Sequence, residues 1–113
     1  MSLDRLYLIT PGFSRPNHPA SERFACPACN VLEGLLAGRE LPPGLEVHRV
    51  AFQRPRASIV ALLGEANQGL PALVLGDEHP IPADAREFDG VRFLDDVERI
   101  AQVLAQRHGL FRL

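Results

Sequence analysis

Two cysteines separated by two residues form the clearest chemical motif in this chain. Cys26, Pro27, Ala28 and Cys29 open an apolar pattern at helical spacing, so the pair is expected at the start of a helix. Unpaired N–H groups and a partial positive charge at a helix N-terminus favour a thiolate over a thiol. The thiolate is the reactive species in disulfide exchange, so Cys26 is expected to be the nucleophile. Cys29, one turn further in and more shielded, is expected to close a disulfide with it.

Two other interpretations of the pair stay open. Both cysteines could be small buried side chains without chemistry of their own. A metal centre would need more ligands, and the four histidines lack the spacing of a zinc finger; His18 alone lies nearby in the sequence. We therefore expect no metal site, and a carrier of metal or of an iron–sulfur cluster through Cys26 remains an alternative.

The periodicity of the chain predicts the elements that position the cysteines. Residues 6–10 form a short apolar run that predicts a buried strand, and residues 11–25 predict a long loop. The helix that follows is expected to bury one face and to end near Gly38; this face comprises Ala28, Val31, Leu32, Leu35 and Leu36.

Further strands are predicted at 45–52, 72–75 and 91–93, with Glu87 and Phe88 as an extension of the last. A second helix is predicted around residues 59–66. For the last helix, Asp95 is expected to be the N-cap because Glu98 follows three residues later, and Gly109 is expected to end it.

These elements predict one α/β domain over residues 1–113 in the order βαβαββα. Strand–helix–strand units favour parallel pairing, and the short last connection allows an antiparallel edge strand. The expected architecture is a three-layer fold, in which a mixed four-stranded sheet carries helices on both faces.

Composition and charge exclude several classes of partner. A formal net charge of -2 argues against a surface for nucleic acid or anionic membrane. The apolar runs are far shorter than the roughly 20 residues that span a bilayer. The N-terminal residues do not resemble a signal peptide, so a cytoplasmic protein is expected. A close cysteine pair in that reducing compartment is typical of redox or metal chemistry rather than of a structural disulfide.

The Cys-Pro-Ala-Cys motif and its context resemble the thioredoxin-like superfamily, particularly glutaredoxins, whose CPxC motif opens the first helix. The chain also resembles an uncharacterised bacterial family of thioredoxin-like domains through Thr10-Pro11-Gly12-Phe13, Cys26-Pro27-Ala28-Cys29 and Arg54-Pro55-Arg56. That resemblance covers nearly the whole chain and implies the thioredoxin-like fold without an assigned activity.

The resemblance also implies substrate-binding residues. Leu70 and Pro71 precede an apolar strand, where thioredoxin-like folds place a cis-proline that faces the cysteines, and the residue before it pairs with a substrate peptide or glutathione. Asp95 and Asp96 match the acidic helix start of glutaredoxins, but the Gly-Gly turn is absent. Independently of the resemblance, Arg23, Arg54 and Arg56 could supply positive charge near the thiolate or a substrate carboxylate, and Arg23 is favoured because it lies three residues before Cys26.

The function predicted from these residues is that of a thiol–disulfide oxidoreductase, with Cys26 and Cys29 as catalytic residues. Pro27, Leu70, Pro71, Arg23, Asp95 and Asp96 are its candidate substrate-binding residues. No bound cofactor is expected; a disulfide-containing protein is the expected partner, with glutathione as the alternative partner or cosubstrate. A binding module that keeps the fold but performs no redox turnover is a further alternative.

Overall fold

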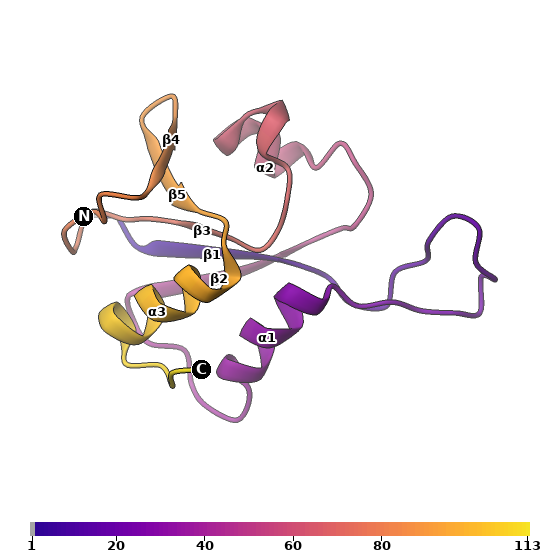
Figure 1. Ribbon diagram of the computed structural model, residues 1–113, viewed down its shortest axis with the longest axis horizontal. Helices are drawn as coiled ribbons and strands as arrows, with labels where there is room; N and C mark the ends of the chain where they lie inside the picture. The colour runs from indigo at the N-terminus through magenta and orange to yellow at the C-terminus, as the bar shows by residue number, and fades with distance from the viewer. Residues whose placement is uncertain (1) are drawn as a thin grey trace.

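A computed structural model describes residues 2–113 of the protein. In chain order these residues form β1 (Asp4–Ile9), α1 (Pro27–Leu36), β2 (Leu45–Val50), α2 (Ala57–Leu63), the 3-10 helix η1 (Glu65–Asn67), β3 (Ala72–Val74), β4 (Arg86–Phe88), β5 (Val91–Leu94) and α3 (Val97–His108). The strands make one sheet in the order β2-β1-β3-β5-β4. Helices α1 and α3 cover one face and α2 covers the other (Figure 1).

The α/β class and the mixed sheet are therefore as predicted, but the sheet has five strands within the described residues rather than four. Arg86–Phe88 is a separate edge strand, because Asp89 and Gly90 adopt positive φ angles and turn the chain back on itself. Strand β4 then pairs antiparallel with β5, from Arg86 opposite Phe93 to Phe88 opposite Val91.

Strand β3 is antiparallel to β1, whereas a strand–helix–strand unit favours parallel pairing. Strands β1 and β2 are parallel, as predicted, and end together with Ile9 opposite Val50. The seven-residue α2 does not carry the chain back along the sheet, so β3 starts beside the end of β1, with Ala72 opposite Tyr7. The segment before β3 consequently lies at the same end of the sheet as the start of α1.

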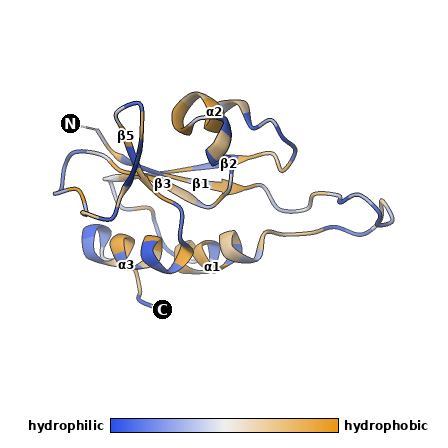
Figure 2. Cartoon of the chain, turned by 45° about the horizontal axis from the view of Figure 1, so that its top comes forward, coloured by the Kyte–Doolittle hydropathy of each residue, from blue (hydrophilic) through white to orange (hydrophobic). Residues whose placement is uncertain are grey.

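Alternating side chains of the strands divide the core into two parts. Leu6 and Leu8 of β1 point toward α1 and α3, whereas Tyr7 points toward α2 and packs with Ile59 and Leu63. The hydropathy colouring shows apolar helix faces turned to the sheet on both sides (Figure 2). Apolar contacts between β1 and the buried face of α1 therefore fix the position of α1 on the sheet.

Two helix predictions need correction. Helix α1 buries Cys29, Leu32 and Leu36, whereas Val31 of the predicted apolar face is 39% exposed. The N-cap of α3 is Asp96 rather than Asp95, since its carboxylate accepts a hydrogen bond from the backbone N–H of Arg99. The C-terminal prediction is confirmed, because α3 ends at Gly109 in the left-handed conformation.

A buried charged cluster joins the start of β1 to the end of α3. Asp4 accepts hydrogen bonds from Arg107 at 2.7 Å and from the backbone N–H of Gly76 at 2.7 Å, and its other oxygen lies 2.7 Å from Nε2 of His108. The side chains of Asp4, Arg107 and His108 are each at most 5% exposed. Gly76 is required here, because a Cβ would lie 2.1 Å from the carbonyl oxygen of Ser2.

Replacing Asp4 should destabilise the fold strongly. Asp4→Ala leaves the buried Arg107 without its carboxylate, which typically costs about 3–5 kcal/mol of the free energy of unfolding. Urea denaturation followed by circular dichroism would measure the loss. Asp84→Ala, which breaks the exposed ion pair with Arg99, is the matched control and should leave the midpoint nearly unchanged. Equal midpoints for the two variants would contradict a structural role for the buried cluster.

Candidate functional site

Cys26 is the N-cap of α1. Its backbone is extended, and its Sγ accepts a hydrogen bond from the backbone N–H of Cys29, with 3.2 Å between nitrogen and sulfur. Pro27 follows in the first turn, where its missing N–H costs no hydrogen bond. The Cys26 sulfur therefore lies at the positive end of the helix, as the sequence predicted, and its side chain is half-buried.

Cys29 lies beneath it, buried to 2% exposure. Its Sγ accepts a hydrogen bond from the backbone N–H of Ile9, at 3.4 Å, so the last residue of β1 contacts the first turn of α1. The pKa of the Cys29 thiol is raised from 9.0 to about 12, chiefly by burial and also by the hydrogen bond and charge of Cys26, while the backbone N–H of Ile9 lowers it. Cys29 is thus a neutral thiol at physiological pH.

Leu70 and Pro71 lie on the other side of Cys26. The Leu70–Pro71 peptide bond is cis, as predicted from the sequence, and so is the Arg54–Pro55 bond. The Sγ of Cys26 is 3.9 Å from the carbonyl oxygen of Leu70, a weak S–H···O contact. The structure thus brings the segment before β3 against the exposed cysteine, although the two are 44 residues apart in sequence.

A cavity of about 350 Å³ opens beside the two cysteines. Its lining includes Pro11, Asn30 and an ion pair between Glu33 of α1 and Arg49 of β2. The pair is bidentate, at 2.9 and 2.6 Å, and the hydrogen bond from Arg49 lowers the pKa of Glu33. Glu33 is therefore an anion at neutral pH, and its charge opposes ionisation of Cys29.

Arg56 is a second cation near the site, 5% exposed. Its guanidinium donates to the carbonyl oxygens of Phe52 and Gln68, and its backbone N–H donates to the Gln68 side chain. No carboxylate of residues 2–113 forms an ion pair with it. Burial, and then the charge of Arg54, lower the pKa of Arg56, while Cys29 and Cys26 act on it in the opposite sense.

The other predicted residues are used differently. Arg23 is exposed and donates to the carbonyl oxygen of Gly12, at 2.9 Å, within the loop before α1. Asp95 pairs with Arg86, and Asp96 caps α3, so both carboxylates have partners away from the cysteines. The pairing of β3 with β5 nevertheless places the start of α3 at the same end of the sheet as Leu70.

Sequence reasoning did not single out Glu33 or Arg49 and ranked Arg56 below Arg23. One signal for Glu33 was available, because it lies four residues after Cys29 and therefore on the same side of a helix. Nothing in the sequence places Arg49 opposite it, since that contact depends on the packing of α1 over β2. The burial of Arg56 likewise depends on two loops that meet only in the folded chain.

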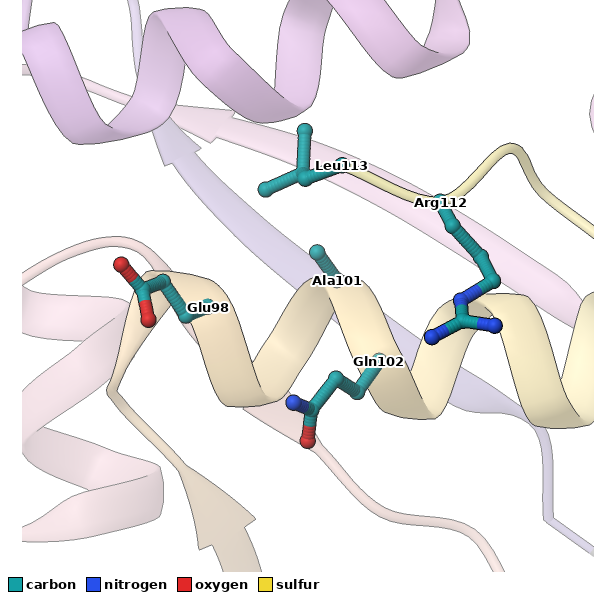
Figure 3. Close-up of a pocket in the computed structure, with 5 residues that line it drawn as sticks. All are labelled: Glu98, Ala101, Gln102, Arg112 and Leu113. Carbon is teal, nitrogen blue, oxygen red and sulfur yellow. The ribbon is translucent and has the colours of Figure 1, made fainter.

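A second cavity, of about 330 Å³, lies away from the cysteines. Glu98, Ala101 and Gln102 of α3 line it together with Arg112 and Leu113 of the C-terminal segment (Figure 3). Among residues 2–113, no group of three or more histidine, cysteine, aspartate or glutamate side chains is arranged to hold a metal ion. None of the helices described here is both long and apolar enough to cross a membrane.

Comparison with known proteins defines the family. Residues 3–112 match the model of a family described as protein of unknown function (DUF3088), so the chain belongs to that family. The expectation of a family without an assigned activity is therefore confirmed. No curated protein and no solved structure matches the chain.

The thiol of Cys29 should titrate above its ordinary range. In Cys26→Ala, the sulfur that raises the pKa of Cys29 is gone but burial remains, so the midpoint should fall between 9.0 and about 12. The pH dependence of ultraviolet thiolate absorbance would measure it, with the urea-unfolded variant as the control. A midpoint at or below that of the unfolded chain would contradict the burial of Cys29.

Proposed function

We propose that the protein is a thiol–disulfide oxidoreductase with a thioredoxin-like fold, in which Cys26 attacks a disulfide and Cys29 resolves the intermediate. The difference between the two thiols carries the proposal. Cys26 borders an open cavity at the start of a helix, whereas Cys29 lies buried one turn below it. Exchange through a mixed disulfide uses one accessible nucleophile and one shielded thiol in this way.

The arrangement around the cysteines supports the thioredoxin-like assignment. A mixed sheet carries helices on both faces, the CPAC motif opens the first helix, and the segment of Leu70 and Pro71 meets Cys26. The Leu70 carbonyl oxygen, which makes only a weak contact in the free protein, would accept a hydrogen bond from the backbone of a bound substrate. Pro27 and Pro71 would contact the same substrate on either side of the sulfur.

In the first step the Cys26 thiolate attacks one sulfur of the substrate disulfide. A bond forms between Cys26 Sγ and that sulfur, the substrate S–S bond breaks, and the second substrate sulfur leaves as a thiolate that takes a proton from solvent. The backbone N–H of Cys29, 3.2 Å from Cys26 Sγ, stabilises the negative charge before attack.

In the second step Cys29 loses its proton to solvent and its thiolate attacks Cys26 Sγ. The bond between Cys26 and the substrate breaks, and the first substrate sulfur leaves as a thiolate that takes a proton from solvent. The substrate has then gained two electrons and two protons, and the protein holds a Cys26–Cys29 disulfide. Part of the high pKa of Cys29 comes from the hydrogen bond and charge of Cys26, which disappear once Cys26 is in a mixed disulfide. Cys29 consequently ionises more readily after the first step than before it.

Return to the dithiol requires a thiol reductant, such as glutathione, which is itself oxidised to its disulfide. In the cytoplasm, where such thiols keep cysteines reduced, the cycle would run in the direction of substrate reduction. Asp95 and Asp96 remain candidates for binding the substrate, because they lie at the same end of the sheet as Leu70.

Single-cysteine variants test the proposal. Cys29→Ser should accumulate a mixed disulfide with a small disulfide such as hydroxyethyl disulfide, because attack proceeds and resolution does not. Cys26→Ser should form none, because its remaining thiol is buried and protonated. Mass spectrometry of the intact protein would detect the adduct, and insulin reduction would measure turnover by the wild type.

Controls separate this function from its alternatives. Alkylation of the unfolded variants would confirm that each carries one intact thiol. An adduct on Cys26→Ser instead of Cys29→Ser would reverse the roles of the two cysteines. Absence of both adduct and turnover in the wild type would reject the oxidoreductase and favour a binding module.

A further inference from the structure

The long segment before α1 is a loop that is closed at its base, and it is called the arm below. Residues 11–25 project away from the three layers, beyond the start of α1 (Figure 1). At its base Phe13 and Phe24 form an antiparallel bridge, in which their backbone N–H groups donate to each other's carbonyl oxygens at 3.2 and 2.9 Å, and the N–H of Gly12 also donates to Phe24, at 2.8 Å. Phe13 also stacks on Phe52, with ring centroids 4.0 Å apart. The arm is therefore anchored to the loop that follows β2.

The arm and that loop form one surface next to the cysteines. We define the arm surface as residues 10–25 together with residues 51–56. A cavity of about 300 Å³ lies in it, lined by Pro11, Phe13, Arg23 and Phe52 among others. Because Pro11 also lines the cavity of Cys26, the two cavities adjoin. A ligand whose disulfide reaches Cys26 could thus continue along the arm.

Charge is distributed unevenly between this surface and the rest of the chain. The arm surface contains four arginines and one acidic residue, Glu22, whereas the rest of the sequence contains eight arginines and thirteen acidic residues. A protein with a net charge of -2 therefore carries a positive region beside its cysteines. The chain contains no lysine, so the arginines of this region are guanidinium cations, which bind carboxylates in a bidentate manner. Arg15, Arg23 and Arg54 are exposed to a ligand, whereas Arg56 is buried and donates to backbone carbonyl oxygens.

The arginines of the arm surface also lack acidic partners. Of the eight arginines elsewhere, five pair with carboxylates, namely Arg49, Arg86, Arg92, Arg99 and Arg107, whereas Arg5, Arg39 and Arg112 form no ion pair among residues 2–113. Within the described residues 2–113, Arg15, Arg23, Arg54 and Arg56 form no such pair. Arg15 instead lies over the ring of Phe24, at 5.4 Å, and Glu22 is engaged with His18. The positive charge of the arm is therefore not neutralised within the protein.

We propose that the arm surface binds an acidic polypeptide segment and thereby selects protein disulfides flanked by aspartate or glutamate. This inference rests on the proposed function of the cysteines. An extended ligand is favoured, because a small thiol such as glutathione would fill the cavity at Cys26 without reaching the outer part of the arm. A polypeptide is favoured over a nucleic acid, because the ligand must carry a disulfide to Cys26.

Paired peptide substrates test the selection. Two disulfide-bridged peptides of equal length would be compared, one with aspartates and one with lysines flanking the disulfide. The wild type should reduce the acidic peptide about tenfold faster at low ionic strength, and the preference should shrink with added salt. The double substitution Arg15→Glu and Arg23→Glu should abolish or invert the ratio of the two rates. Because this ratio is internal to one variant, a change in thiol reactivity cancels.

A matched double substitution provides the control. Arg39 and Arg112 are also exposed and without a carboxylate partner among residues 2–113, and Arg39 lies beyond the far end of α1 from Cys26. Arg39→Glu with Arg112→Glu should preserve the ratio of the wild type. The arm surface does not select acidic substrates if the wild type reduces both peptides at the same rate, or if the control variant loses the preference for the acidic peptide as fully as the variant with Arg15→Glu and Arg23→Glu.

A binding measurement separates failure of the arm from failure of the redox chemistry. The acidic peptide with serines in place of its cysteines would be labelled for fluorescence anisotropy and titrated with the wild type and both double variants. Loss of peptide binding only in the variant with Arg15→Glu and Arg23→Glu supports recognition of acidic segments by the arm surface, even if no disulfide is reduced. Reduction of hydroxyethyl disulfide without peptide binding would contradict recognition by the arm surface and leave the proposed oxidoreductase function intact. Tighter binding of a single-stranded oligonucleotide of equal charge would also overturn it.

Discussion

The hydrogen bond from the backbone N–H of Ile9 to the sulfur of Cys29 lies where the elements of the candidate site meet. It joins the last residue of the strand that lies between β2 and β3 to the first turn of α1. Because β2 ends beside Ile9 and β3 begins nearby, Arg49, Leu70 and Cys26 gather at one end of the sheet. The same contact keeps Cys29 buried, and burial is the largest cause of its raised pKa.

Three charged side chains, those of Glu33, Arg49 and Arg56, lie near the two cysteines. Glu33 is held as an anion by Arg49 and makes ionisation of Cys29 harder. Arg56, buried without a carboxylate partner among the described residues, joins two loops through carbonyl oxygens, and the two cysteines oppose the lowering of its own pKa. The electrostatics of the site therefore come from α1, β2 and the loop before α2, rather than from the motif alone.

The sequence supported those predictions that depend on local patterns. The helix start at Cys26, the αL residue Gly109 and the first two strands all depend on neighbouring residues, and the structure contains them. Predictions that depend on packing were less accurate. The buried face of α1 includes Cys29 rather than Val31, because Cys29 packs with Leu32 and Leu36 in the core, and β3 is antiparallel to β1 after the short α2. Long-range pairs such as Glu33 with Arg49 have no local sequence signal.

The buried cluster at Asp4 has a consequence for synthesis of the chain on the ribosome. Its partners Arg107 and His108 are 103 and 104 residues away. While the chain grows, β1 is complete almost from the start, yet its carboxylate stays unpaired until the last turn of α3 has left the exit tunnel. A buried, uncompensated charge is costly, so the nascent chain has little drive to close its sheet around β1 early. The packing around β1 is therefore completed only once α3 is available to it.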